Sequence, residues 1–277
     1  MPACTADAPG SGAFLGTKIV NVFPGNAAHG LPAVLGVYVL QSGETGAPLA
    51  VMDGTRLTHW RTAAASALAA RFLARADASR LLMVGAGALA PFLVRAHASV
   101  RKLRHVTVWN HRREGAERLA ATLAAELAPS GIAVAATGDL AAAASAADII
   151  SCATLSSAPL LLGEWLRPGT HVDLVGAFNL HMREADDEAL RRARVFIDTE
   201  AALTEGGDVA LAIQSGAIAA AHVEGTLADL CRGGLKTPRA AGDITLFKSV
   251  GTAIEDLAAA MLVWERLEGD VKAGAAG

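Results

Sequence analysis

Residues 80–90 read Arg-Leu-Leu-Met-Val-Gly-Ala-Gly-Ala-Leu-Ala, and this stretch decides the fold class. The apolar run before the glycines predicts a short buried strand, and the segment 88–98 predicts the helix that follows it. Gly85 permits the tight turn between them, and Gly87 lets the backbone approach a pyrophosphate at the helix N-terminus. Ala90 stands at the third position of the G-x-G-x-x-G/A fingerprint. The stretch therefore predicts a dinucleotide-binding unit rather than an ordinary strand-turn-helix.

Composition limits what else the chain can be. Its 277 residues allow one large domain or two ordinary ones, and 52% hydrophobic with 18% charged residues is typical of a globular protein. The net charge of −3 gives no reason to expect a nucleic acid or a membrane surface as partner. No segment resembles a membrane span or a signal peptide, so we expect a cytoplasmic location. The three cysteines lack metal spacing, and we predict no metal site.

Strands recur at regular intervals after residue 80, with helices between most of them. The expected strands are 81–84, 105–109, 132–136, 148–152, 171–175 and 194–198. This alternation predicts an α/β fold with a doubly wound parallel sheet of the Rossmann type.

The N-terminal part has a different pattern. Residues 1–12 predict an irregular arm, and strands at 18–23, 36–40 and 49–52 follow one another without helices, which favours a separate antiparallel sheet. Near the C-terminus, Thr252-Ala-Ile-Glu255 predicts a capping box. The buried face of the helix that follows is expected to carry Ile254, Leu257, Ala258, Met261 and Leu262.

We expect this C-terminal helix to fold back onto the N-terminal sheet. The Rossmann domain, residues 63–242, is then inserted into a smaller α+β domain made of residues 1–62 and 243–277.

The second strand of the expected Rossmann unit ends at Asn110 and is followed by His111, Arg112 and Arg113. An NAD-specific site normally has a carboxylate at this strand end, which binds both ribose hydroxyls. Asn110 does not repel a 2′-phosphate, and Arg112 or Arg113 can pair with one. We therefore predict a preference for NADPH over NADH. The alternative is that these basic residues are a solvated start of the next helix.

Two cations near the N-terminal sheet are candidate anion ligands. Thr58 is expected to cap a helix, which places Arg61 in its first turn, where a cation faces the positive end of the helix dipole. Such an unfavourable local choice can mark a functional site, with Arg61 and the free N–H groups binding a carboxylate. An exposed arginine without a role is an equally good interpretation of the local sequence. Lys18 opens an apolar strand, and alone it indicates little because lysines at strand edges reach water.

Five ordered motifs, spread over residues 14–267, resemble the ornithine cyclodeaminase/mu-crystallin family. They are Lys18-Ile-Val-Asn-Val-Phe-Pro-Gly-Asn26, Leu57-Thr-His-Trp-Arg-Thr-Ala-Ala-Ala-Ser66, Val84-Gly-Ala-Gly87, Gly163-Glu-Trp-Leu-Arg-Pro-Gly169 and Thr245-Leu-Phe-Lys-Ser-Val-Gly251.

The resemblance implies a Rossmann domain inserted into a smaller domain that forms a homodimer through its sheets. It also implies that Lys18 and Arg61 hold a substrate carboxylate. The residues expected to bind the cofactor are Gly85, Ala86, Gly87, Ala88, Leu89, Asn110, His111, Arg112, Arg113, Ala153, Thr154, Leu155, Val175, Gly176 and Thr245.

One departure from the family pattern bears on the reaction. Members that cyclise ornithine carry an aspartate where this chain has Phe178, after Val175-Gly-Ala177. An apolar ring can neither accept a proton nor hold an ammonium group. The chain is therefore more similar to the family's imine reductases, which reduce Δ1-pyrroline-2-carboxylate to L-proline and Δ1-piperideine-2-carboxylate to L-pipecolate. Phe178 would then contact the substrate.

The resemblance leaves other functions open: an ornithine cyclodeaminase that uses NAD, an alanine-type dehydrogenase, or an NADPH-dependent binding protein without catalysis. In the reductase, hydride passes to the imine carbon, and the imine proton comes from solvent, Lys18 or Glu205. Family members also have a longer N-terminal segment with another carboxylate-binding arginine. Without such a segment, carboxylate binding rests on Lys18 and Arg61 alone.

Overall fold

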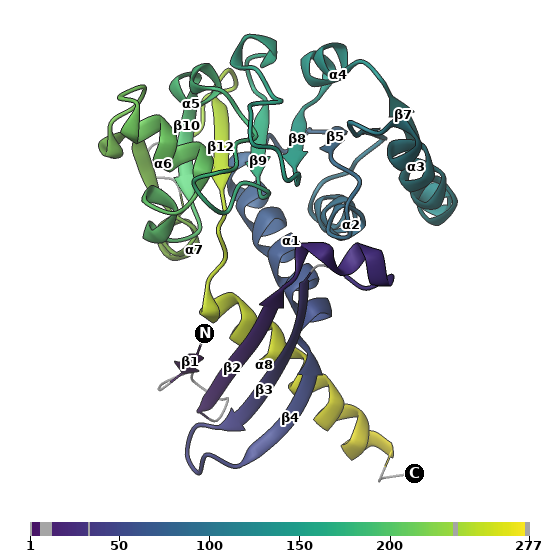
Figure 1. The fold of residues 1–277 in the computed structure, drawn as a ribbon, viewed down its shortest axis with the longest axis vertical. Helices are drawn as coiled ribbons and strands as arrows, with labels where there is room; N and C mark the ends of the chain where they lie inside the picture. The colour runs from purple at the N-terminus through teal and green to yellow at the C-terminus, as the bar shows by residue number, and fades with distance from the viewer. Residues whose placement is uncertain (1, 6–12, 33, 235–237, 275–277) are drawn as a thin grey trace. The chain divides into compact units, whose positions relative to one another are not determined.

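The computed structural model describes residues 2–5, 13–32, 34–234 and 238–274. The chain divides into two compact units (Figure 1). The first unit comprises Met1–Thr62 and Gly251–Gly277, and the second comprises Ala63–Val250.

The first unit contains a four-stranded antiparallel sheet with strand order β1-β2-β3-β4. Its elements are β1 (Pro2–Thr5), β2 (Phe14–Val22), the 3-10 helix η1 (Pro24–His29), β3 (Val34–Ser42), β4 (Pro48–Asp53) and α8 (Ala253–Gly274). The expectation of an irregular arm over residues 1–12 is wrong for Pro2–Thr5, because these residues pair with β2 in antiparallel register. Residues 6–12 lie outside the described part.

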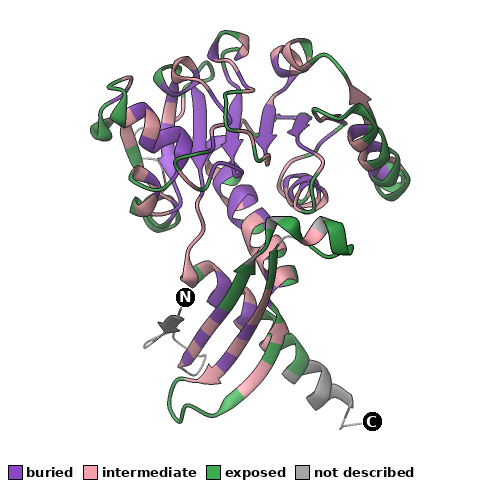
Figure 2. Ribbon diagram, viewed as in Figure 1, coloured by how far each residue is buried: buried purple, intermediate pink, exposed green. Residues whose placement is uncertain are grey.

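The core of the first unit lies between one face of the sheet and α8. Tyr38 and Leu40 of β3 pack with Leu257 and Ala260 of α8, and all four are buried. The expected buried face of this helix is therefore only partly correct, since Ile254 is 53% exposed and Leu262 54% exposed. Which apolar side chains are covered depends on how α8 is rotated and placed on the sheet (Figure 2). The periodicity of the sequence does not predict that placement.

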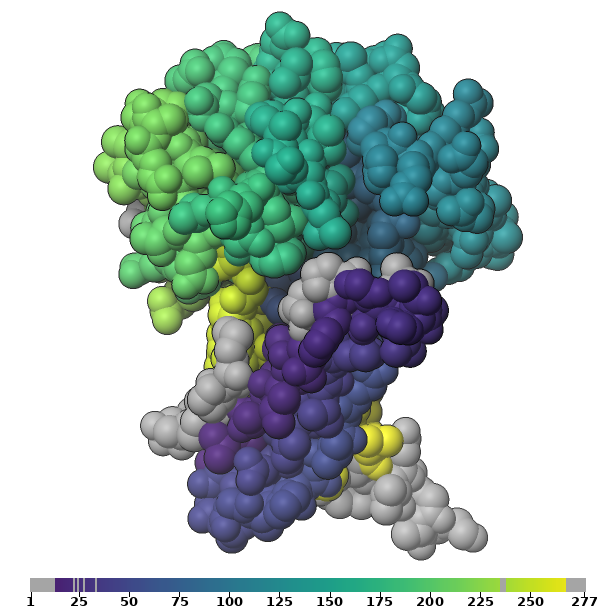
Figure 3. All heavy atoms as spheres, in the orientation of Figure 1, coloured from purple at the N-terminus to yellow at the C-terminus, as the bar shows by residue number. Residues whose placement is uncertain are grey.

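The other face of the antiparallel sheet carries exposed apolar side chains. Ile19 on β2 is 55% exposed, and Val51 on β4 is 70% exposed. Figure 3 views this face, where β2, β3 and β4 appear as adjoining purple and blue surface.

The second unit is built on an eight-stranded parallel sheet with order β11-β10-β12-β9-β8-β5-β6-β7. Its strands are β5 (Arg80–Val84), β6 (His105–Trp109), β7 (Ala133–Thr137), β8 (Ile149–Cys152), β9 (His171–Leu174), β10 (Ala193–Ile197), β11 (Val223–Thr226) and β12 (Ile244–Lys248). Its helices are α2 (Ala90–Val100), α3 (Arg113–Leu127), α4 (Leu140–Ala146), α5 (Asp187–Arg192), α6 (Gly207–Gln214) and α7 (Leu227–Gly233). This confirms the predicted α/β fold with a doubly wound parallel sheet.

The parallel sheet is covered on both faces. Leu81 and Met83 of β5 join a core cluster that includes Phe92 of α2, whereas Leu82 and Val84 join a second cluster that includes Leu190 of α5. A strand buried on both faces favours apolar side chains at every position, which explains the uninterrupted run before the glycine turn.

β12 corrects the expected domain boundary. It was assigned to the smaller domain, but it pairs in parallel with β9 and β10 inside the eight-stranded sheet. The second boundary therefore follows Val250 rather than preceding residue 243. In the described part of the chain, no helix is both long and apolar enough to span a membrane.

Candidate functional site

The glycine turn has the geometry of a phosphate-binding loop. Gly85 follows β5 with φ +109°, and a Cβ there would lie 2.6 Å from the carbonyl oxygen of Ala153. No heavy atom lies within 4 Å of the place where a Cβ of Gly87 would be. α2 begins at Ala90, so Ala88 and Leu89 lead directly into its N-terminus. The backbone is therefore accessible at Gly87, next to free N–H groups.

Asn110 lies beside this turn. Its amide nitrogen donates to the carbonyl oxygen of Arg112 at 2.9 Å, and a Cβ on Gly115 would lie 2.8 Å from the same nitrogen. Arg112 contacts the ring of His111, and Arg113 pairs with Glu117 one turn further along α3. The strand end that normally presents a ribose-binding carboxylate thus presents an amide followed by basic side chains.

The carboxyl ends of β5, β8 and β9 meet at one edge of the sheet. Ala153 donates its backbone N–H to Val84, and Val175 donates to Cys152, each at 2.9 Å. Thr154 and Leu155 follow β8, and Gly176 follows β9. In open α/β sheets, ligands bind outside the carboxyl ends of the strands, so these residues lie where a nucleotide is expected.

Thr245 does not belong to this set. It lies near the amino end of β12, where it pairs with His171, and its hydroxyl donates to the carbonyl oxygen of Leu73 at 3.0 Å. The side chain is completely buried. Its expected role in cofactor binding is wrong, because strand polarity places it at the opposite end from the glycine turn.

A buried acidic pair, which the sequence analysis missed, lies behind the same edge. Glu184 accepts hydrogen bonds from the backbone of Thr154 and of Gly176, and Asp208 accepts from the backbone of Glu184. Nζ of Lys248 lies 3.2 Å from Oδ2 of Asp208, and all three charged side chains are buried. No local sequence pattern predicts that a glutamate is buried. The one available signal for Glu184 was the position of a carboxylate soon after the end of a strand.

Two other predicted residues of the second unit are accessible. Phe178, in the loop after β9, is 49% exposed. Glu205 is exposed in the segment before α6.

In the first unit, Lys18 and Arg61 share one acidic partner. Nζ of Lys18 lies 2.6 Å from Oδ2 of Asp256, and Nε of Arg61 lies 3.0 Å from Oδ1 of the same carboxylate. Nη1 of Arg61 donates to Glu255 at 2.8 Å. All four side chains are largely buried, so sequence-distant positions form one compact charged cluster. Oε2 of Glu255, the residue expected to close a capping box, accepts this hydrogen bond from Arg61.

Burial lowers the pKa of Lys18, and the bond to Asp256 opposes that shift. Burial, with the Asp256 charge, also raises the pKa of the neighbouring Tyr38 to about 12, so its hydroxyl stays protonated. The Arg61 guanidinium has five N–H donors. Of these, the donors on Nη1 and Nε face the two acids.

Arg61 does not lie in the first turn of its helix, contrary to the prediction. α1 runs over Gly54–Leu73, and Asp53 accepts from the backbone of Arg56, so the helix begins before Thr58. The hydroxyl of Thr58 donates to Gly54 within the helix. Arg61 therefore lies beyond the first turn, and no free N–H groups beside it form an anion pocket. The charged cluster and the family motif are the features that mark Arg61 as a candidate site residue.

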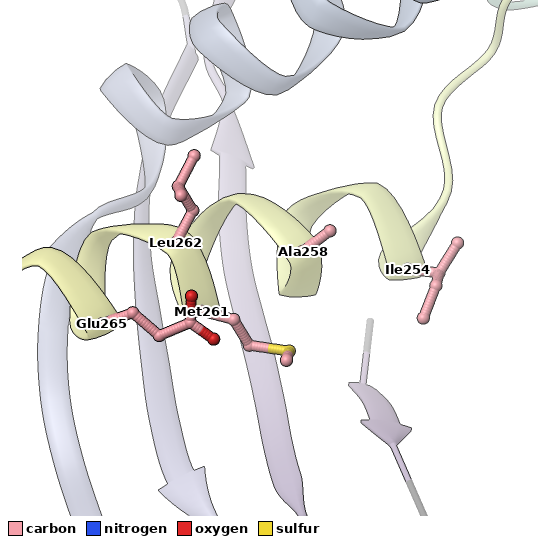
Figure 4. Close-up of a pocket in the computed structure, with 5 residues that line it drawn as sticks. All are labelled: Ile254, Ala258, Met261, Leu262 and Glu265. Carbon is pink, nitrogen blue, oxygen red and sulfur yellow. The ribbon is translucent and has the colours of Figure 1, made fainter. Parts of the chain in front are cut away.

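A separate pocket lies along α8. Ile254, Ala258, Met261, Leu262 and Glu265 line a volume of about 360 Å³ (Figure 4). None of the predicted site residues lines it. Within the described residues, no group of three or more His, Cys, Asp or Glu side chains is arranged to hold a metal ion.

Comparison with known proteins agrees with these motifs. The model of the ornithine cyclodeaminase/mu-crystallin family matches residues 1–270. A Δ1-pyrroline-2-carboxylate reductase from Paracoccus denitrificans is 45% identical over 244 residues, covering 87% of this chain and 76% of that protein.

Two solved structures are similar over almost the whole chain. The Thermococcus litoralis Δ1-pyrroline-2-carboxylate reductase in complex with NADH and L-proline has a TM-score of 0.87 and 32% identity, covering 98% of this chain and 87% of that one. An archaeal alanine dehydrogenase dimer with bound NAD has a TM-score of 0.86 and 30% identity, covering 98% and 85%. The chain therefore belongs to the ornithine cyclodeaminase/mu-crystallin family.

Proposed function

We propose that this chain is an NADPH-dependent reductase of cyclic ketimines that carry a carboxylate, converting Δ1-pyrroline-2-carboxylate to L-proline and Δ1-piperideine-2-carboxylate to L-pipecolate. The relatives named as reductases and dehydrogenases support the wider class, a nicotinamide-dependent oxidoreductase. The observation that carries the proposal is the cluster of Lys18 and Arg61 on Asp256, since two buried cations held side by side suit a small carboxylate.

The cofactor supplies the hydride, and the protein binds and orients the reactants. The second unit's glycine turn holds the pyrophosphate, and Arg112 takes the 2′-phosphate, because Arg113 is already paired with Glu117. Lys18 and Arg61 hold the substrate carboxylate. Of the candidate proton donors, Lys18 is favoured over Glu205, because burial lowers its pKa and makes its proton easier to release toward the imine nitrogen.

The same proposal includes a homodimer formed through the outer face of the antiparallel sheet. Ile19, Leu35 and Val51 expose apolar surface on β2, β3 and β4. Contiguous apolar surface of this kind marks an interaction site.

The test is consumption of NADPH with each of the two imines, compared with NADH. We expect turnover with NADPH, and a loss of about 100-fold or more in kcat/KM for Arg61→Ala, as when a charged hydrogen bond to a carboxylate is removed. The matched control is Arg118→Ala, since Arg118 is an exposed arginine on α3. Tight NADPH binding without turnover of either imine would contradict the reductase and favour the binding-protein alternative.

Cofactor preference is tested separately with Arg112→Ala. Removing the proposed phosphate partner should lower the NADPH-to-NADH ratio of kcat/KM by about tenfold or more, because charge-assisted hydrogen bonds contribute about 1.5–3 kcal/mol. An unchanged ratio would show that the basic segment is only a solvated helix start.

A further inference from the structure

Glu184 is a completely buried glutamate in the loop after β9. Its Oε1 accepts from the backbone N–H of Thr154 at 2.6 Å and from the Thr154 hydroxyl at 2.8 Å. Its Oε2 accepts from the backbone N–H of Gly176 at 2.7 Å. One side chain thus ties together the two segments that follow neighbouring strands, β8 and β9.

These two segments are packed too closely for substitution at Gly176. A Cβ there would collide with the carbonyl oxygen of Thr154 and would lie 2.5 Å from Oε1 of Glu184. All three donors point at carboxylate oxygens, so the ionised form, which is the stronger acceptor at both oxygens, is the one that this arrangement favours. Protonation turns one oxygen into a hydroxyl, which is a weaker acceptor, and removes the charge that strengthens all three bonds.

Asp208 and Lys248 hold Glu184 in turn. Oδ1 of Asp208, in the first turn of α6, accepts from the backbone N–H groups of Glu184 at 2.7 Å and Ala185 at 2.9 Å. Its Oδ2 lies 3.2 Å from Nζ of Lys248, the last residue of β12. The chain of contacts therefore links three strand ends and one helix.

We propose that Glu184 is a positioning residue for the nicotinamide cofactor: its carboxylate holds the segments around Thr154 and Gly176 in the arrangement that binds the cofactor, and Asp208 with Lys248 holds Glu184. This rests on the proposed role of those segments in cofactor binding. It assigns a function to a buried group that hydride transfer itself does not use.

The charges around Glu184 give the proposal a pH signature. Burial and the Asp208 charge raise the pKa of Glu184 to about 7, against the opposing effects of Lys248 and the Thr154 bonds. Cys152 of β8 also faces this acidic group, and burial keeps its thiol neutral by raising its pKa. Protonation of Glu184 below about pH 7 should release one of its three donors and weaken cofactor binding.

The experiment measures the Kd of NADPH by its fluorescence between pH 5.5 and 9, without any imine. For the wild type we expect affinity to fall as the pH falls through about 7. Glu184→Gln should bind NADPH about tenfold or more weakly at pH 8, the loss expected for a buried charge-assisted bond, and its affinity should lack the pH step. The matched control is Glu188→Gln, a glutamate on α5 whose side chain is 43% exposed and pairs with Arg191.

A folded Glu184→Gln variant with the wild-type Kd and pH step would overturn the proposal. If that variant does not fold, Thr154→Val serves, because it removes one donor and leaves the carboxylate. The pH step should then move to higher pH, and an unmoved step would also overturn the proposal. Because the readout is cofactor binding alone, absence of imine turnover would count against the proposed reaction and not against this role of Glu184.

Discussion

At the scale of single residues, the cluster around Lys18 and Arg61 is stable because its positive and negative side chains neutralise one another. Lys18 and Arg61 face Glu255 and Asp256, two cations against two carboxylates. Removing one partner of a buried ion pair leaves an uncompensated charge, which costs about 3–5 kcal/mol. The acids therefore allow two cations to be held largely buried in the first unit.

Gly251 leaves the space that Arg61 occupies. Its φ is +85°, and a Cβ there would collide with Nη1 and lie 2.8 Å from Nη2 of Arg61. We expect Gly251→Ala to displace the guanidinium and raise the KM for the imine about tenfold or more, with the Kd for NADPH unchanged. Steady-state kinetics and cofactor titration check this.

The control for Gly251→Ala is Gly138→Ala, since nothing lies within 4 Å of a Cβ at that position. An unchanged KM in a folded Gly251→Ala variant would remove Arg61 from the carboxylate site.

At the scale of elements, the close approach of α8 to β2 and β3 depends on Gly16 of β2, over which the side chain of Tyr38 of β3 lies. Tyr38 is buried against Leu257, and a Cβ on Gly16 would collide with its hydroxyl and lie 2.6 Å from Cζ. The hydroxyl thus occupies the space above Gly16. Paired small and large residues of this kind let a helix lie close to a sheet.

Gly16→Ala should therefore destabilise the first unit by about 1–3 kcal/mol, the usual cost of overpacking a core. Urea unfolding followed by circular dichroism measures the change, again with Gly138→Ala as control. A double variant, Gly16→Ala with Tyr38→Phe, should recover part of the loss because the hydroxyl is the nearest atom. Equal stability of Gly16→Ala and the wild type would show that the sheet shifts to accommodate the methyl group.

At the scale of the whole molecule, stability is linked to pH through neutral groups in the parallel sheet. His171 is completely buried on β9, with Nδ1 3.0 Å from the Thr245 hydroxyl. Burial lowers its pKa to about 3. The unfolded chain therefore takes up a proton below pH 6.5, while the folded chain does not until about pH 3. This contribution to stability is present above pH 6.5 and is lost as the pH falls through that window.

We predict that, as the pH falls from 6.5 to 5, His171 lowers the free energy of unfolding by up to about 1.4 kcal/mol per pH unit. Denaturant unfolding of wild type and His171→Gln at several pH values isolates the effect, because the variant lacks that part of the slope. His105→Gln, at an exposed position on β6, should keep the wild-type slope. Parallel slopes for wild type and His171→Gln would show that His171 is protonated in the folded chain.

The sequence alone determined the fold class, and it predicted a nucleotide-binding edge at the glycine turn. The apolar run before Gly85 and the regular strand spacing depend on local conformation and on burial of whole strands, both of which short segments encode. Lys18 and Arg61 were found by motif, because a family pattern preserves chemistry even where local structure is misjudged. The helix start at Thr58, predicted from local sequence, and the cofactor role of Thr245, implied by the resemblance, were both misjudged.

Only the tertiary structure decided which charges meet. Arg61 and Glu255 are 194 positions apart, and no periodicity predicts that α8 presents Glu255 and Asp256 to Lys18 and Arg61. The burial of Glu184 likewise depends on Asp208 and Lys248, which come from a later helix and strand. Pairing between distant charges depends on how the helices and strands pack against one another. The free energy that favours one packing is a sum over the whole core, so no single segment of sequence determines it.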